Sequence, residues 1–171
     1  GYYNQWDFNL SVVNKYLYEA KKSLIDIIEL GFRMPKQKYF LGPFAYTTDI
    51  FLNKINLPTS IEYAVMINGS DFIKDEKNIN NLFNYKKFSP ISIVRIAIKF
   101  EDAKKTKKIT IGLKKLGYKV CLNLMQSQGK KLSDFKLICK IIRSWKSVDI
   151  LYFADSLGSM SPNEVKSITL V

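Results

Sequence analysis

Six polar residues stand at or just beyond the ends of apolar runs, where such side chains can bind a substrate or move a proton: Glu29, Arg33, Asn123, Gln126, Asp155 and Ser156. We expect Glu29, Asn123 and Asp155 to be catalytic, and the other three to bind substrate. A carboxylate in a stretch as apolar as that around Glu29 is costly to bury unless it is paired. Glu29 is therefore either an acid–base group near a metal or half of an ion pair with Arg33 or Arg95.

The other five residues also allow two interpretations each. Arg33 can hold a substrate carboxylate through two hydrogen bonds, or it is an exposed loop arginine. Asn123 and Gln126 interrupt an apolar run, so burial would require hydrogen bonds to a substrate or to an internal amide network. Asp155 and Ser156 open a loop that contains glycine, where they either contact a ligand or hold a turn.

Several kinds of chemistry are excluded by what the chain lacks. It contains no histidine, so histidine triads, histidine-containing zinc sites and imidazole catalysis cannot arise within it. Neither GxGxxG nor GxxxxGK[ST] occurs, so a dinucleotide or P-loop site lacks its phosphate cradle. Ser127 and Ser159 have no histidine base. Binding of Mg²⁺ or Mn²⁺ by Glu29 and Asp155 alone stays open, because these ions accept oxygen ligands.

The charge is strongly positive, with 27 Lys and Arg against 15 Asp and Glu, a net charge of +12. Clustered cations bind phosphates, but here only Arg33, Arg95 and Arg143 are arginines and the lysines recur as scattered pairs. Base recognition favours bidentate arginine. We therefore expect no specific nucleic-acid partner.

The remaining composition is typical of a cytoplasmic chain with a core of its own. The apolar share is 47%, which is enough for one buried core. No apolar run approaches the roughly 18 residues of a membrane span, and no signal peptide is evident, so we expect no membrane partner. Cys121 and Cys139 lie in apolar stretches and are expected to be buried free thiols.

Hydrophobic patterning predicts alternating strands and helices. Short, nearly continuous apolar runs predict strands buried on both faces, at residues 25–30, 61–67, 91–98, 119–125 and 148–154. Helical spacing predicts helices at residues 10–24, 101–116 and 132–145 and a last one opened by Ser161. We expect N-caps at Asn9 or Ser11, at Ser133 and at Ser161, and a glycine C-cap at Gly117.

This order of elements indicates the α/β class. The strands recur about every 30 residues, the length of a right-handed βα unit. Five units can form a flavodoxin-like sheet or part of a TIM (β/α)₈ barrel. Because the sequence opens on a loop before a helix and ends within a helix, we expect a partial TIM barrel that spans residues 1–171 as a single domain.

Five segments carry a resemblance to a known family: GYYNQWDF (1–8), IELGFR (28–33), GPFAYTTD (42–49), LNLMQ (122–126) and ADSLGSMSP (154–162). In this order they resemble the aldolase branch of the HMG-CoA-lyase-like, or DRE-TIM metallolyase, superfamily, which includes the hydroxy-oxovalerate aldolases. The resemblance implies a TIM barrel. It also implies cleavage or formation of a carbon–carbon bond of a small oxo-acid through a pyruvate-like enolate, with a divalent metal, Mn²⁺ or Mg²⁺, as cofactor.

The family's main metal-binding motifs have no counterpart in this chain. In relatives the first strand ends in an Asp-Cys-Thr-Leu-Arg-Asp-Gly-like motif, which supplies the enolate-stabilising arginine and a metal-binding aspartate. A His-x-His pair on the seventh strand supplies two further ligands. The resemblance therefore implies strands two to six, without the first strand and the last two βα units, and no metal ligand within this chain.

Two function hypotheses follow. In the first, the parent protein is a carbon–carbon lyase, while this chain alone is inactive, binds no metal and tends to form homo-oligomers through unpaired strand edges. In the second, the chain is a non-catalytic binding or scaffolding module whose basic surface attracts acidic partners. We expect the aromatic residues Tyr2, Tyr3 and Trp6 to pack on neighbouring helices rather than to cover the mouth of the barrel.

Overall fold

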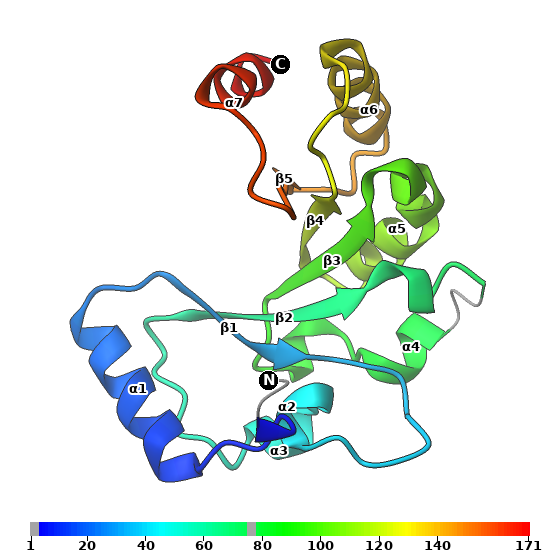
Figure 1. Ribbon diagram of the computed structural model, residues 1–171. Coiled ribbons are helices and arrows are strands. Elements are labelled where there is room, and N and C mark those ends of the chain that lie inside the picture. The colour runs from blue at the N-terminus through cyan, green and yellow to red at the C-terminus, as the bar shows by residue number, and fades with distance from the viewer. Residues whose placement is uncertain (1–3, 75–77) are drawn as a thin grey trace.

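The computed structural model describes residues 4–74 and 78–171, whose five strands form one parallel sheet. In the sheet they lie in chain order (Figure 1): β1 (Ile27–Phe32), β2 (Glu62–Asn68), β3 (Ile93–Lys99), β4 (Lys119–Met125) and β5 (Ile150–Phe153). A flavodoxin-like sheet would instead have the order 2-1-3-4-5. The sequential order is that of a (β/α) barrel, so the α/β class and the partial barrel are both confirmed.

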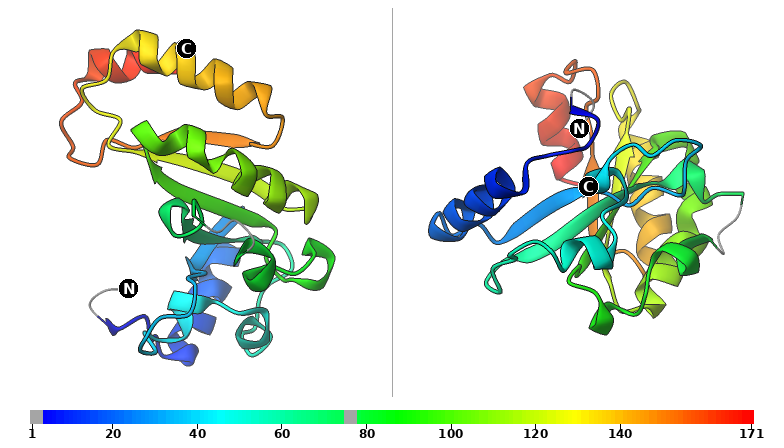
Figure 2. Two further views of the ribbon diagram at one scale, coloured as in Figure 1. Left: turned by 90° about the vertical axis from the view of Figure 1, so that its right-hand side faces the viewer. Right: turned by 90° about the horizontal axis from the view of Figure 1, so that it is seen from below.

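The helices follow one another around the outside of this sheet, from α1 through α3, α4 and α5 to α6 and α7 (Figure 1). Successive strands also rotate, so β1 and β5 run in clearly different directions (Figure 2). The helices are α1 (Leu10–Lys22), α2 (Pro43–Tyr46), α3 (Asp49–Leu52), α4 (Asn78–Leu82), α5 (Lys107–Lys115), α6 (Leu132–Ser144) and α7 (Pro162–Thr169). Short 3₁₀ segments lie at Gly69–Asp71, Lys86–Phe88 and Phe100–Thr106.

The main core lies between the sheet and the helices. Alternate strand residues, among them Val65, Ile96 and Leu122, are fully buried there. They pack with helix residues such as Leu17 and Phe135. Because each strand buries every second side chain under the helices, the remaining side chains face the other side of the sheet.

The other side, which we call the inner face, carries Ile27, Glu29, Ala64, Ile93, Arg95, Cys121, Asn123, Ile150 and Tyr152. These side chains line a cavity of about 390 Å³, and all of them belong to strands. A small buried cluster of Ala64, Ile93 and Cys121 forms the floor. The inner face is therefore an apolar floor with polar groups on it.

The predicted strands and most of the predicted helices are confirmed, with boundaries that differ by up to two residues at most ends. The predicted helix 101–116 is a 3₁₀ segment followed by α5. The helix predicted to end at residue 24 stops at Lys22, and Leu24 is 86% exposed instead of buried. Sequence patterns gave no indication of α2, α3 or α4, which have only four or five residues each.

Three of the predicted caps are confirmed and one is wrong. Asn9 accepts from the Ser11 N–H, Ser161 caps α7 together with Glu164, and Gly117 has a positive φ of 94° just after α5. Ser133, however, lies inside α6. The helix begins at Leu132, as predicted, and its N-cap is Lys131, whose N–H donates to the Asp134 carboxylate at 3.2 Å.

Smaller expectations are tested as well. Trp6 packs edge-on against Phe32 with ring centroids 4.7 Å apart, whereas Tyr2 and Tyr3 lie outside the described residues. Both cysteines are free thiols, Cys121 buried and Cys139 half-buried. Within residues 4–74 and 78–171, no helix has the length and apolar character needed to cross a membrane.

Candidate functional site on the inner face

Glu29 and Arg95 form a bidentate ion pair on the inner face. The Arg95 Nε and Nη2 atoms each donate to a different Glu29 carboxylate oxygen, both at 2.6 Å. The pair joins β1 to β3 across Ala64 of β2, whose small side chain leaves room for it. Glu29 is therefore half of an ion pair, as in the second interpretation, and its partner is Arg95.

The pair is not buried, contrary to the expectation from its apolar surroundings. Glu29 and Arg95 have 32% and 27% of their side chains exposed, because the alternation of the strand turns them to the inner face. Hydrogen bonding to Glu29 raises the pKa of Arg95 above its ordinary value and outweighs the opposing effect of burial. Arg95 therefore remains a permanent positive charge beside the cavity.

Asn123 lies closer to the carboxyl ends of the strands than Arg95. Arg95 is level with Cys121, and Asn123, two residues further along β4, is level with Tyr152 on β5. The Asn123 side chain is half-buried, and its amide group makes no hydrogen bond to any other described residue. The internal amide network that was the alternative for Asn123 is thus not formed within the described part of the chain, and its side chain can bond a ligand.

Cys121 is a poor nucleophile in this position. Its thiol is 2% exposed, and burial raises its pKa despite an opposing hydrogen bond with Tyr152. Desolvation likewise raises the pKa of Tyr152. With raised pKa values, both groups are protonated at neutral pH and can act only as weak donors or acceptors. Cys121 therefore lacks the thiolate, which is the reactive form of cysteine.

Arg33 lies elsewhere, and the alternative of an exposed loop arginine is wrong: it is 2% exposed. Its Nε and Nη2 atoms donate to the Thr47 carbonyl oxygen at 3.1 and 2.7 Å, and Nη1 donates to the Leu82 carbonyl oxygen at 3.4 Å. Nη2 also lies 2.7 Å from Asp49 Oδ1. Every guanidinium nitrogen is thus engaged, so the geometry does not favour the role of substrate clamp.

The remaining predicted residues hold the loop that follows β5. Ser156 Oγ accepts from the Gln126 N–H at 2.9 Å, and Asp155 Oδ2 accepts from the Met160 N–H at 2.7 Å. The Met160 N–H is the main reason that the pKa of Asp155 lies below its ordinary value. These contacts match the turn interpretation of Asp155. Roles for Asp155, Gln126 and Ser156 toward a substrate stay predictions.

The structure therefore divides the six predicted residues. Glu29 and Asn123 share the inner-face cavity with Arg95 and Tyr152, whereas the other four do not line it. Tyr152 was missed, and Arg95 was considered only as an ion-pair partner. Both occupy the same period-two positions of their strands as Asn123 does, and this is the signal that could have identified them.

The described residues do not make a metal site on their own. Among residues 4–74 and 78–171, no three His, Cys, Asp or Glu side chains converge as metal ligands. Glu29 is bonded to Arg95, and Asp155 is held in its own loop outside the cavity. These contacts give no support to the interpretation that Glu29 and Asp155 alone hold Mg²⁺ or Mn²⁺, which stays a prediction.

The fold and the inner face together define part of a (β/α) barrel with polar groups on its inner side. Neither a protein-family model nor a curated protein matches the sequence. Among solved structures, the chain is similar to the crystal structure of "the N-terminal domain of a putative aldolase from Bacteroides vulgatus", with a TM-score of 0.85 and 28% identity. The match covers 99% of this chain and 56% of that one, so this chain spans little more than half of the length of that solved chain.

Proposed function

We propose that this chain is part of the barrel of an aldolase-type carbon–carbon lyase of the HMG-CoA-lyase-like superfamily that acts on a small oxo-acid. The observation that carries the proposal is the group formed by Glu29, Arg95 and Asn123 on the inner face of a barrel-type sheet. Similarity to a domain of an aldolase-like protein supports it. Barrel enzymes place their chemistry at the carboxyl ends of the strands, the end toward which Asn123 lies.

The three side chains have complementary roles in this proposal. Arg95 uses Nε and Nη2 for Glu29, which leaves N–H groups that can donate to a substrate carboxylate or a developing enolate oxygen. The Asn123 amide can donate to the oxo group. The Glu29 carboxylate is held in place by Arg95 and can take a proton from the substrate or return it.

A divalent metal, Mn²⁺ or Mg²⁺, belongs to the proposal for the parent protein and not to this chain. The described residues do not fit a complete metal site, so the roles given above to Glu29, Arg95 and Asn123 do not depend on the ion. In this proposal its ligands come from parts of the parent protein beyond this chain.

The test is an assay of the full-length protein. We expect pyruvate to be released from hydroxy-oxovalerate in the presence of Mn²⁺, as followed by NADH oxidation with lactate dehydrogenase, and the rate to fall to the blank after EDTA. Equal rates with and without EDTA would contradict the metal requirement. No pyruvate from any short hydroxy-oxo-acid would contradict the lyase and favour the scaffolding alternative.

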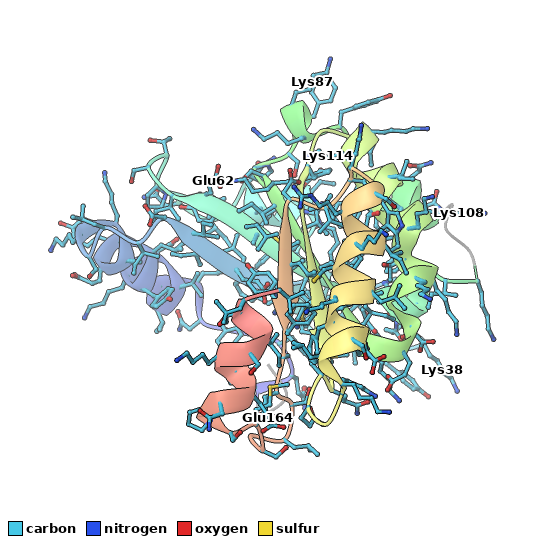
Figure 3. The ribbon with its side chains drawn as sticks, turned by 90° about the horizontal axis from the view of Figure 1, so that it is seen from above. Lys38, Glu62, Lys87, Lys108, Lys114 and Glu164 are labelled. Atoms are coloured by element: carbon cyan, nitrogen blue, oxygen red, sulfur yellow. The ribbon has the colours of Figure 1, made fainter. Side chains whose placement is uncertain are left out.

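The scarcity of arginine supports the prediction of no specific nucleic-acid partner, since base recognition favours bidentate arginine. Lys38, Lys87 and Lys108 project from well-separated parts of the surface (Figure 3). Recognition of a nucleic acid usually needs a continuous basic stripe. This prediction and the cytoplasmic location both remain proposals.

A further inference from the structure

A second cavity, the largest of those described, is lined by loops and helices and shares no residue with the inner face. Its volume is about 750 Å³, and none of its lining residues lines the inner-face cavity. We call it the outer cleft. Its walls come from the loop after β1, from α2 and α3, and from α4, segments that lie together in the lower part of Figure 1.

The outer cleft exists because the connections around β2 contain unusually short helices. Helices α2 and α3 have four residues each and α4 has five. Four residues of helix rise about 6 Å, whereas a seven-residue strand is more than 20 Å long. The connections around β2 are therefore built largely of loops, and the outer cleft lies between these loops and the short helices.

The walls of the cleft are aromatic and apolar. Phe40 stacks on Tyr46 with ring centroids 5.5 Å apart and an angle of 18° between the planes. Phe40 and Ile50 are 76% and 79% exposed, although burial of such side chains is favourable. Phe51 completes the wall beside them. A concave surface of this size with aromatic walls is typical of a small-molecule site.

The charge of the cleft is positive. Lys36, Lys38 and Lys54 line it, and Asp49 is the one acid among the described lining residues. Asp49 Oδ1 is already 2.7 Å from Arg33 Nη2, so these two charges cancel at the floor. Three lysines therefore remain without a compensating acid inside the cleft, and they attract an anion.

From this combination we propose that the outer cleft binds a small organic anion with an aromatic or extended apolar body and a carboxylate or phosphate head. The body packs against Phe40, Tyr46 and Ile50, and the head lies among Lys36, Lys38 and Lys54. A second copy of the chain is disfavoured as the occupant of the cleft, because a symmetric contact there would set Lys36, Lys38 and Lys54 of the two copies against one another. The site is separate from the lyase proposal and does not depend on it.

The test uses the full-length protein and a pair of fluorescent probes. Anilinonaphthalene sulfonate has an aromatic body and an anionic head, and N-phenylnaphthylamine has the same rings without the sulfonate. We expect saturable binding of the sulfonate, with the neutral probe bound about tenfold more weakly, since three partly screened charges contribute about that factor. Competition by an alkyl carboxylate and by the matching alkyl phosphate then identifies the preferred head group.

Two matched variants locate the binding. K36M/K38M/K54M should weaken sulfonate binding about tenfold, whereas K21M/K136M/K140M, which removes three exposed lysines elsewhere, should leave it within about twofold. F40S should weaken the binding of both probes, and F88S, at a phenylalanine outside the cleft that is also largely exposed, should weaken the binding of neither.

Three results would overturn the proposal. The first is an absence of sulfonate binding to the full-length protein, as expected if another part of the parent chain fills the cleft. The second is equal affinity for the charged and the neutral probe. The third is an equal loss of affinity in both triple-lysine variants, which would show that only the overall charge matters.

Discussion

Arg33 and Asp49 form an ion pair beneath the surface, with Arg33 Nη2 2.7 Å from Asp49 Oδ1 and their side chains 2% and 14% exposed. Asp49 also accepts from Ser89 Oγ at 2.7 Å and from Asn84 Nδ2 at 3.2 Å. Arg33 adds its bond to the Leu82 carbonyl oxygen. The pair thus ties the loop after β1 to the connection between β2 and β3, and it fixes the floor of the outer cleft.

We expect Arg33→Met to lower the free energy of unfolding by about 3 kcal/mol, because it leaves the Asp49 carboxylate without its counter-charge and the Thr47 carbonyl oxygen without its donor. Urea unfolding measures this loss. Arg143→Met, at an exposed arginine of α6, should change the free energy by less than about 0.5 kcal/mol. A loss at Arg33 no larger than at Arg143 would show that the network does not stabilise the fold.

The burial of Arg33 shows where the sequence stops being informative. The strands could be predicted because continuous apolar runs mark chain segments covered on both sides, and β4 begins and ends where its pattern does. Arg33 gives no such local signal, since its acceptors on Thr47 and Leu82 are 14 and 49 residues away. Its surroundings are set by tertiary contacts, and the same is true of α2, α3 and α4.

The candidate site was predictable only where its residues lie in strands, because the periodicity of a strand is a local signal and the path of a loop is not. Glu29 and Asn123 are polar residues within strands, and the period of two places them on one face with Arg95. Asp155 and Ser156 follow a strand, and the path of the next loop decides where their side chains go. Ser133 was predicted as the N-cap of α6 because serine is a good capping residue. The N-cap is Lys131 instead, because the Asp134 side chain accepts a hydrogen bond from the Lys131 N–H.

Our second prediction concerns the Glu29–Arg95 pair and rests on the proposed function. Glu29→Gln should reduce kcat at least a hundredfold, since a proton-transfer group contributes about 10²–10⁴. The free energy of unfolding should fall by only about 1 kcal/mol, because both partners are partly exposed. The pyruvate assay and urea unfolding, applied to the same full-length variant, separate these two effects.

Glu62→Gln is the matched control for Glu29→Gln. Glu62 accepts from Lys119 Nζ at 2.8 Å, and both residues lie at the amino ends of their strands, away from Asn123. This variant also loses one carboxylate of a lysine or arginine pair on the sheet, and its kcat should stay within about twofold of the parent. Equal losses of kcat in the two variants would show that Glu29 has no specific role in the reaction.

The third prediction is a pH dependence at Asp149. Desolvation raises the pKa of this carboxyl group, but hydrogen bonds from Lys114 Nζ at 2.6 Å and from the Val120 N–H at 2.8 Å outweigh it and bring the pKa below its ordinary value. A carboxylate whose pKa is lower in the folded state stabilises that state above the unfolded pKa. This contribution is lost as the pH falls through the folded pKa.

Unfolding free energies measured between pH 6 and pH 2 test this expectation. The fall in stability below about pH 4 should be smaller in Asp149→Asn than in the parent protein, because the variant has no carboxylate to protonate. Asp7→Asn, at an exposed acid near α1, serves as the control and should follow the parent curve. Identical curves for Asp149→Asn and the parent would show that the Asp149 contacts do not stabilise the fold.

The last prediction concerns the 171-residue chain produced alone. In its sheet β1 pairs with β2 and β5 pairs with β4, so each outer strand has one edge that makes no strand pair within the described residues. Beside these edges Ile27 and Tyr152 are 44% and 42% exposed on the inner face. Open apolar edges recruit other chains, so we expect this chain to self-associate in light-scattering measurements and to release no pyruvate above a metal-only blank.

Ile27→Lys places a charge at the β1 edge and should shift the chain toward monomer, whereas Leu137→Lys, on the exposed side of α6, should not. A monomer at all concentrations, or an equal effect of both lysines, would show that the strand edges do not drive association, and turnover by the isolated chain would show that its inner face suffices for catalysis.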